Sequence, residues 1–173
     1  MSQYVVQFGA KDVAKLAEIF AHEIAGRKCA IQVLSKENLG TLIYQESPLP
    51  LPDALVMIIR GEVVSLIARP SQGALRYGLI LPPNFNGQRL SLWSATLEWT
   101  DNGWQEAWER LLHWSDLSFI TVGFEEGVEV SDECLSVESF PWQAWPTVIA
   151  AVRSDIGGQR QWTVRSNPSF PRV

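Results

Sequence analysis

The sequence predicts an α+β fold with a mainly antiparallel meander sheet and two or three helices packed against it. Three observations support this class. Apolar runs of strand length alternate with turns rich in glycine and proline, two segments carry apolar residues at helical spacing, and the composition is that of an ordinary globular protein, 46% hydrophobic and 19% charged. A chain of 173 residues without an internal repeat is most simply one globular domain, residues 1–173.

The strands are predicted from short apolar runs bounded by turn residues. These runs are residues 3–8, 29–34, 41–46, 54–60, 63–69, 74–81, 90–99, 117–124, 134–138 and 159–165. The proline-rich segment 47–53 cannot join a ladder and is expected to be an extended connector. Gly61-Glu62 has the glycine that a type II′ turn needs, which predicts a tight hairpin between the runs on either side of it.

The helices are predicted from the 3.6-residue period. In residues 11–26 the apolar side chains recur at spacings of three and four, at Val13, Leu16, Phe20 and Ile24. In residues 103–114 a similar stripe follows Asn102, an expected N-cap, and Glu106 is spaced to pair with Arg110. A third helix is expected between residues 142 and 153, ended by Gly157-Gly158.

Negative charge is concentrated in the middle of the chain. Residues 98–138 hold eleven carboxylates and one basic side chain, a balance of −10, whereas residues 1–97 sum to +2 and residues 139–173 to +3. Five of the eight tryptophans lie in this acidic stretch or directly before it. Such asymmetry produces an oriented electrostatic field and suggests a basic partner.

We therefore expect a non-catalytic interaction protein, an adaptor, chaperone or inhibitor, that presents an acidic, tryptophan-bearing face to a basic protein surface. Carboxylates would steer the encounter and an aromatic anchor would then be buried. The expected partner-binding residues are Glu125, Glu126, Glu129, Asp132, Glu133, Trp142 and Trp145. A homodimer formed through a strand edge or a tryptophan patch is a further alternative.

The rival hypothesis is an enzyme or binding module for a polar small molecule or glycan. Carboxylate pairs flank glycosidic bonds in many glycan sites, and tryptophan faces supply stacking surface. The alternative ligand site consists of Trp99, Asp101, Trp104, Glu106 and Glu109. Core burial of Trp104 and helix stabilisation by the carboxylates would explain the same residues without a ligand.

Other chemistries lack a motif in this sequence. No metal site or cofactor is expected, because there is no ligand spacing for zinc, no EF-hand order and no phosphate-binding glycine loop. The net charge of −5 disfavours nucleic-acid binding. No signal peptide or membrane span is apparent, and Cys29 and Cys134 are expected to be free thiols, so the sequence predicts a cytoplasmic protein.

Overall fold

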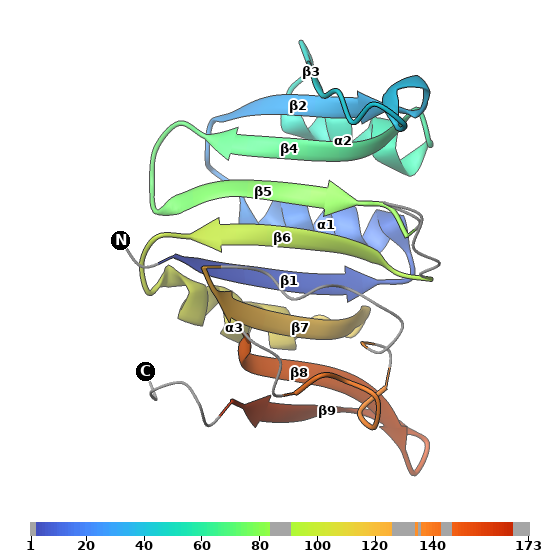
Figure 1. Cartoon of the computed structure of the whole chain (residues 1–173), viewed down its shortest axis with the longest axis vertical. Coiled ribbons are helices and arrows are strands. Elements are labelled where there is room, and N and C mark those ends of the chain that lie inside the picture. The colour runs from blue at the N-terminus through green and yellow to red at the C-terminus, as the bar shows by residue number, and fades with distance from the viewer. Residues whose placement is uncertain (1–2, 84–90, 126–133, 135, 143–146, 168–173) are drawn as a thin grey trace.

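The computed structural model describes residues 3–83, 91–125, 134, 136–142 and 147–167. These residues form one nine-stranded sheet in which all neighbouring strands are antiparallel, with three helices on one face (Figure 1). The strand order is β3-β2-β4-β5-β6-β1-β7-β8-β9. The predicted α+β class, with its antiparallel meanders β4-β5-β6 and β7-β8-β9, is confirmed.

The elements have the following bounds. The strands are β1 (Tyr4–Ala10), β2 (Cys29–Ser35), β3 (Gln45–Glu46), β4 (Val63–Pro70), β5 (Leu75–Leu81), β6 (Trp93–Trp99), β7 (Leu117–Phe124), β8 (Thr147–Ile156) and β9 (Gln159–Ser166). The helices are α1 (Val13–Glu23), α2 (Leu51–Ile59) and α3 (Gly103–Leu112), with a 3₁₀ turn, η1 (Lys36–Asn38).

Each helix joins two strands that run parallel to each other. Because neighbours are antiparallel, β3 and β4 are parallel on either side of β2, and β6 and β7 are parallel on either side of β1. Helices α2 and α3 make these two crossovers. Helix α1 joins β1 to β2, which are also parallel to each other, but it crosses the sheet in the opposite direction and starts from a strand that runs opposite to β3 and β6. Crossovers of the same hand therefore place all three helices on the same face.

The main core lies between the helices and the sheet. Leu16 and Phe20 of α1, Ile58 of α2 and Leu111 of α3 are buried in one cluster with residues of the central strands. A second, smaller cluster covers the other face of β7 and β8, where the segment around Phe140 packs on the sheet. Both faces of β8 are consequently buried.

One predicted strand is a helix. Residues 54–59 fall within α2 and Arg60 is its C-cap, so the predicted hairpin over Gly61-Glu62 does not form, and the chain passes from α2 into β4. The proline segment is the helix start rather than an extended connector: Pro50 is the N-cap and Pro52 lies in the first turn, where a missing N–H costs nothing. Ala54, Leu55 and Ile58 then share the buried face.

Two further elements differ from expectation. The third helix expected between residues 142 and 153 is absent from the described part of that range, because β8 begins at Thr147, and Gly157-Gly158 is the turn of the β8–β9 hairpin. Both glycines have positive φ, 59° and 79°, as a type I′ turn requires. The described residues of 134–138 do not form a strand: Cys134 is in a 3₁₀ turn and residues 136–138 form a bend and a turn. The strand expected at 41–46 shrinks to Gln45–Glu46.

Helix α3 also begins differently. Asn102 makes no side-chain capping bond; Asp101 Oδ1 accepts the hydrogen bond from the Gly103 N–H instead, at 2.8 Å. The expected partner of Arg110 is replaced as well. Arg110 pairs with Glu23 of α1, at 3.0 Å, rather than with Glu106.

Candidate functional site

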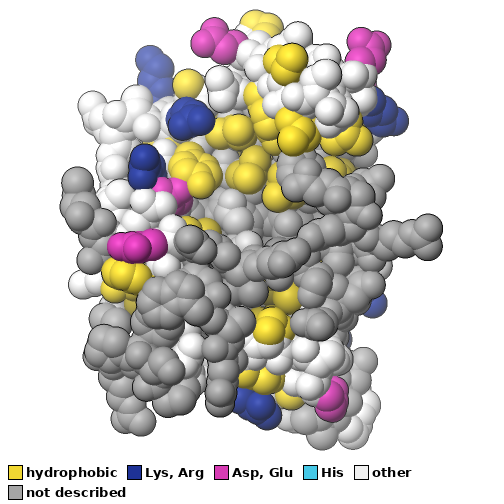
Figure 2. Space-filling model, in the orientation of Figure 1, with side chains coloured by type: hydrophobic (Ala, Val, Ile, Leu, Met, Phe, Trp, Pro, Cys, Tyr) yellow, Lys and Arg dark blue, Asp and Glu magenta, His cyan; other side chains and the backbone are white. Residues whose placement is uncertain are grey.

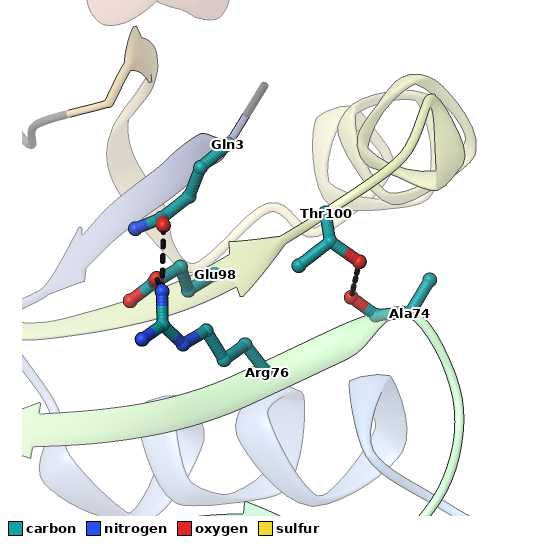
Figure 3. Close-up of polar contacts among 5 residues, drawn as sticks. All are labelled: Gln3, Ala74, Arg76, Glu98 and Thr100. Carbon is teal, nitrogen blue, oxygen red and sulfur yellow. Dashed lines mark hydrogen bonds and ion pairs between the residues drawn. The ribbon is translucent and has the colours of Figure 1, made fainter. Parts of the chain in front are cut away.

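A buried carboxylate, Glu98, organises one end of the sheet on the face opposite the helices. The register between β5 and β6 shifts between Leu75 and Tyr77, so Arg76 is an extra residue in β5, a bulge. The bulge lets both Arg76 and Tyr77 reach Glu98. Arg76 Nη1 donates to Glu98 Oε1 at 3.2 Å and to Gln3 Oε1 at 2.8 Å (Figure 3).

This cluster stabilises the sheet and does not expose a reactive group to solvent. Glu98 is 2% exposed. The pKa of Tyr77 is raised to about 12, chiefly by burial and then by the hydrogen bond to the Glu98 carboxylate and its negative charge. The phenol therefore stays protonated at neutral pH and donates to Glu98. Nearby, Thr100 Oγ1 donates to Ala74 O at 2.9 Å and ties the ends of β5 and β6 together.

A second feature is the arginine hollow, a surface depression of about 810 Å³ between the C-terminal end of α1 and the N-terminal end of α3. Arg27 lies over the indole ring of Trp99, 5.4 Å from the ring centroid. On the other side it contacts Gly73, whose φ of +102° and close approach leave no room for a Cβ. Arg27 is thus clamped, and none of the ion pairs between described residues involves it.

The opposite wall of the arginine hollow carries the remaining charges. Arg110 Nε and Nη2 contact the Glu23 carboxylate at 3.0 Å, and the Glu23 side chain is 1% exposed. Asp101 and Glu106 also line the arginine hollow, so three carboxylates and two guanidinium groups give it a balance of −1. Such a lining can bind a small molecule that carries both an anionic and a cationic group.

The alternative ligand site is therefore brought together in part. Trp99, Asp101 and Glu106 line the arginine hollow, whereas Trp104 and Glu109 do not. Trp104 is buried and stacks on Tyr4, with ring centroids 5.1 Å apart, and Glu109 is exposed on α3. Trp99 is 5% exposed beneath Arg27, so its ring is not an open platform for a sugar.

Sequence reasoning did not identify Glu23, Arg27 and Arg110 as residues of this hollow. A signal for Glu23 was present: it lies seven residues after Leu16 and three after Phe20, on the buried stripe of α1. A carboxylate on an apolar stripe needs a buried partner, but the sequence does not reveal that the partner is Arg110, 87 positions away.

The partner-binding residues are only partly described. Glu125 is exposed at the end of β7 with φ +66°, and its N–H donates to Gln3 O at 2.7 Å. Trp142 is half-buried: its indole N–H donates to Val137 O at 2.9 Å, and Arg165 lies 4.6 Å from its ring centroid. The other members, Glu126, Glu129, Asp132, Glu133 and Trp145, lie outside the described residues.

The described carboxylates of residues 98–138 do not gather on one surface. Glu98 is buried on the face opposite the helices, whereas Glu106 and Glu109 lie on α3, on the helix-covered face. Glu138 lines a hollow together with Lys11, Arg153 and Arg160. Arginines from outside residues 98–138 thus lie near two of these carboxylates. Arg76 forms an ion pair with Glu98, and Arg153 and Arg160 line the same hollow as Glu138.

Exposed apolar side chains are concentrated near the outer edge of the sheet that β2 and β3 form. Of the six large hydrophobic residues that are exposed in the described part of the chain, five lie between residues 42 and 59. We call this set the apolar end: Leu42, Ile43, Leu49, Val56 and Ile59, each 39% to 57% exposed. Leu42, Ile43 and Leu49 flank β3, which pairs with β2, and Val56 and Ile59 belong to α2, which packs on β2. Figure 2 shows hydrophobic side chains at the surface over this end.

The outer edge of β2 is incompletely covered at the apolar end. β3 pairs with β2 only at Gln32 and Val33, and Ser47 N–H donates to Ile31 O at 2.9 Å. The ladder supplied by β3 does not extend over the ends of this seven-residue strand. An edge of this kind, beside exposed apolar side chains, can accept an added strand from another chain.

Comparison of the chain with protein-family models, with curated proteins and with solved structures found no match in any of the three. Function is therefore argued from the surfaces themselves. Among residues 3–83, 91–125 and the later described segments, no three His, Cys, Asp or Glu side chains lie close enough to hold a metal ion. No helix in this part of the chain is long and apolar enough to cross a membrane.

Proposed function

We propose that this protein is a non-catalytic interaction protein that binds another protein through the apolar end. The observation that supports the proposal is the gathering of five of the six exposed large hydrophobic side chains beside one incompletely paired strand edge. Isolated exposed apolar residues are ordinary on protein surfaces, but a concentration of them marks an interaction site. An added strand on β2 would supply hydrogen bonds, and the apolar side chains would supply buried area.

The charges around the apolar end favour a basic partner. Residues 36–62 carry six charged side chains, all exposed: Lys36, Glu37, Glu46, Asp53, Arg60 and Glu62. Their sum is −2, and the whole chain carries −5. A polar rim of this sign attracts a positively charged protein, and it repels a second copy of the same surface. Residues 125–133 hold five further carboxylates, which add to the negative charge of the chain that attracts a basic partner.

Site-specific photocrosslinking in the native cell tests this proposal. A photoreactive phenylalanine analogue at Ile43, 57% exposed, should form one reproducible adduct with a basic protein, and Ile59→Asp in the same chain should abolish it. The same analogue at Val164, 46% exposed but on β9, is the matched control and should give no such adduct. No specific adduct at Ile43, or the same adduct at Val164, would rule the apolar end out. An adduct with a second copy would replace the basic partner by a homodimer.

The cysteines bear on the cellular compartment. Neither Cys29 nor Cys134 forms a disulfide. Burial raises the pKa of Cys29, more than the nearby charge of Arg27 lowers it, so the thiol is not activated as a nucleophile. Two cysteines that form no disulfide fit a reducing compartment such as the cytoplasm, where we place the protein.

A second candidate function is suggested by the clamped Arg27. A guanidinium held by an indole ring and a glycine, without a carboxylate partner among the described residues, is preorganised for an anionic ligand group. Asp101 and Glu106 across the arginine hollow would bind a cationic group of the same ligand. We propose that a small molecule bearing both groups, such as an amino acid, binds there.

Amide NMR signals test the second candidate. Free amino acids should shift the signals of Gly73 and Gly103, which border the arginine hollow, and Arg27→Gln should abolish the shift. Arg69→Gln, an exposed arginine outside the arginine hollow, is the control. Neutral monosaccharides should produce no shift, because the ring of Trp99 is covered. A response to sugars alone would favour a glycan site instead.

A further inference from the structure

A small hollow of about 280 Å³ lies at the end of the sheet where β1 ends, β6, β7 and β9 begin, and the β8–β9 hairpin turns. We call it the serine hollow, because Ser91, Ser118, Ser136 and Ser154 all line it. Its charged lining residues are Lys11, Arg153, Arg160 and Glu138, a balance of +2. Its volume is slightly below the roughly 300 Å³ at which sites for drug-sized ligands begin, so it suits a small ligand.

Arg153 is fixed in place by groups that carry no negative charge. Its Nε donates to Leu117 O at 3.3 Å and its Nη2 to Trp114 O at 2.9 Å, while its guanidinium lies 3.9 Å from the ring centroid of Trp162. No ion pair between described residues involves it. The fold therefore orders this cation without neutralising it.

The neighbouring charges reinforce the positive potential. Burial and the charge of Arg160 lower the pKa of Arg153, against a smaller opposite effect of Asp116. Arg160 is itself anchored by a hydrogen bond from Nη1 to Ser115 O at 3.3 Å. Arg160 has further interactions of its own. We therefore base the site on Lys11 and Arg153 rather than on Arg160.

One hydroxyl group in the lining has no partner among the described residues. Ser154 lines the serine hollow, and its Oγ is buried without a hydrogen bond to any of them. A buried hydroxyl left in this way costs about 1–3 kcal/mol. A ligand oxygen in the serine hollow would accept this hydrogen bond, as well as those of the Lys11 ammonium and the remaining Arg153 N–H donors.

We propose that the serine hollow binds a small oxyanion of the phosphate type, either free or as the phosphate group of a small metabolite. Three features of the site converge on this ligand: an ordered guanidinium with unneutralised charge, an exposed ammonium group and an unpartnered hydroxyl. Phosphate offers several strong acceptor oxygens and two negative charges to these donors. This site is separate from the apolar end and from the arginine hollow, and it does not depend on either proposed function.

Binding of inorganic phosphate to the full chain tests the proposal. Calorimetry and thermal unfolding are measured with phosphate, with sulfate and with phosphoserine, each against chloride at equal ionic strength. Phosphate should raise the unfolding temperature saturably. Lys11→Gln and Ser154→Ala should each weaken phosphate about three- to tenfold, since each removes one donor. If phosphoserine binds more tightly than phosphate, the ligand is a phosphomonoester; if they bind equally, it is the free ion.

The matched control is Lys28→Gln, which removes the same charge from an exposed lysine outside the serine hollow and should leave phosphate affinity unchanged. Ser154→Ala should not unfold the protein, because the lost hydroxyl makes no hydrogen bond to the described residues. Equal effects of phosphate and chloride, or equal phosphate affinities of the Lys11 and Lys28 variants, would overturn the proposal.

Discussion

Glu98 and Glu23 are buried and Arg153 is partly buried, and each of these ionic side chains is held by a different set of hydrogen-bond partners. Glu98 accepts hydrogen bonds from Arg76 and Tyr77, Glu23 accepts two from Arg110, and Arg153 donates to backbone carbonyls. Removing one partner leaves an uncompensated group, and this costs more free energy than the intact pair contributes to stability.

The pKa of Tyr77 gives a first prediction. Its folded-state pKa of about 12 lies above the ordinary value of 10.0, so the folded chain holds this proton more tightly than the unfolded chain does. The stabilisation is complete below pH 10 and is lost as the pH rises from about 10 to about 12. Tyr77→Phe should flatten this part of the stability curve, measured by urea unfolding. An equally steep fall in both proteins would contradict the assignment.

The Glu23–Arg110 pair gives a second prediction. Arg110→Met strands the Glu23 carboxylate, which is 1% exposed, and should lower the free energy of unfolding by about 3 kcal/mol, at the low end for a buried pair because Arg110 is 42% exposed. Glu23→Leu combined with Arg110→Met should recover much of that loss. Urea titration measures both. A loss below about 1 kcal/mol in the single variant would mean that solvent already screens Glu23.

Among the elements, α2 and β8 differ from the predictions for the same physical reason: an apolar run of strand or helix length carries no usable period when the side chains on both of its faces are apolar, whether or not both faces are buried. Leu55 and Ile58 of α2 are buried while Val56 and Ile59 are exposed and equally apolar, and β8 buries Ala150 and Val152 on one face and Ala151 on the other. Pro50 and Pro52 were an available signal for a helix start.

The face of α2 can be tested by two neighbouring truncations. Ile58→Ala should lower the free energy of unfolding by about 2–4 kcal/mol, because Ile58 is buried and its truncation leaves a cavity. Ile59→Ala, in the next position and exposed, should change it by less than about 0.5 kcal/mol. Guanidinium unfolding compares the two. Similar losses at both positions would argue against the helical face described for α2.

The β8–β9 turn gives a prediction about backbone conformation. Gly157 has φ +59° and open space around its position, so Gly157→Ala should cost about 1 kcal/mol for conformational reasons alone. Gly157→Asn should cost less than half as much, since asparagine tolerates this region. Thermal unfolding of the two variants measures the difference. If asparagine were as costly as alanine, the turn would not be of the type I′ form.

At the scale of the whole molecule, all three candidate surfaces border the ends or the edge of the sheet. The arginine hollow and the serine hollow lie where strands end and helices or turns begin, and the apolar end borders the outer strands β2 and β3. The broad faces are largely occupied: the helices cover one, and the second cluster covers part of the other. Ligand and partner sites are therefore expected at the periphery.

The charge around the apolar end predicts the oligomeric state. Two copies that meet through the apolar end bring rims of −2 together, so the protein should remain monomeric at low ionic strength, about 0.02 M, where repulsion is least screened. Any self-association should appear only at about 0.5 M salt. Light scattering after size-exclusion chromatography measures this, with the double variant Ile43→Asp, Ile59→Asp as control. A dimer at low salt that weakens as salt is added would contradict the prediction.

Local patterns in the chain were enough for the α+β class, for α1 and α3 and for most strands, because helical and strand periods are set by neighbouring residues. They were not enough for the sites. Glu23 meets Arg110, and Lys11 shares a hollow with Arg153, only because α1 crosses three strands and β1 enters the sheet between β6 and β7. Those contacts depend on strand order, and strand order is decided by burial and packing across the whole sheet, which no local pattern encodes.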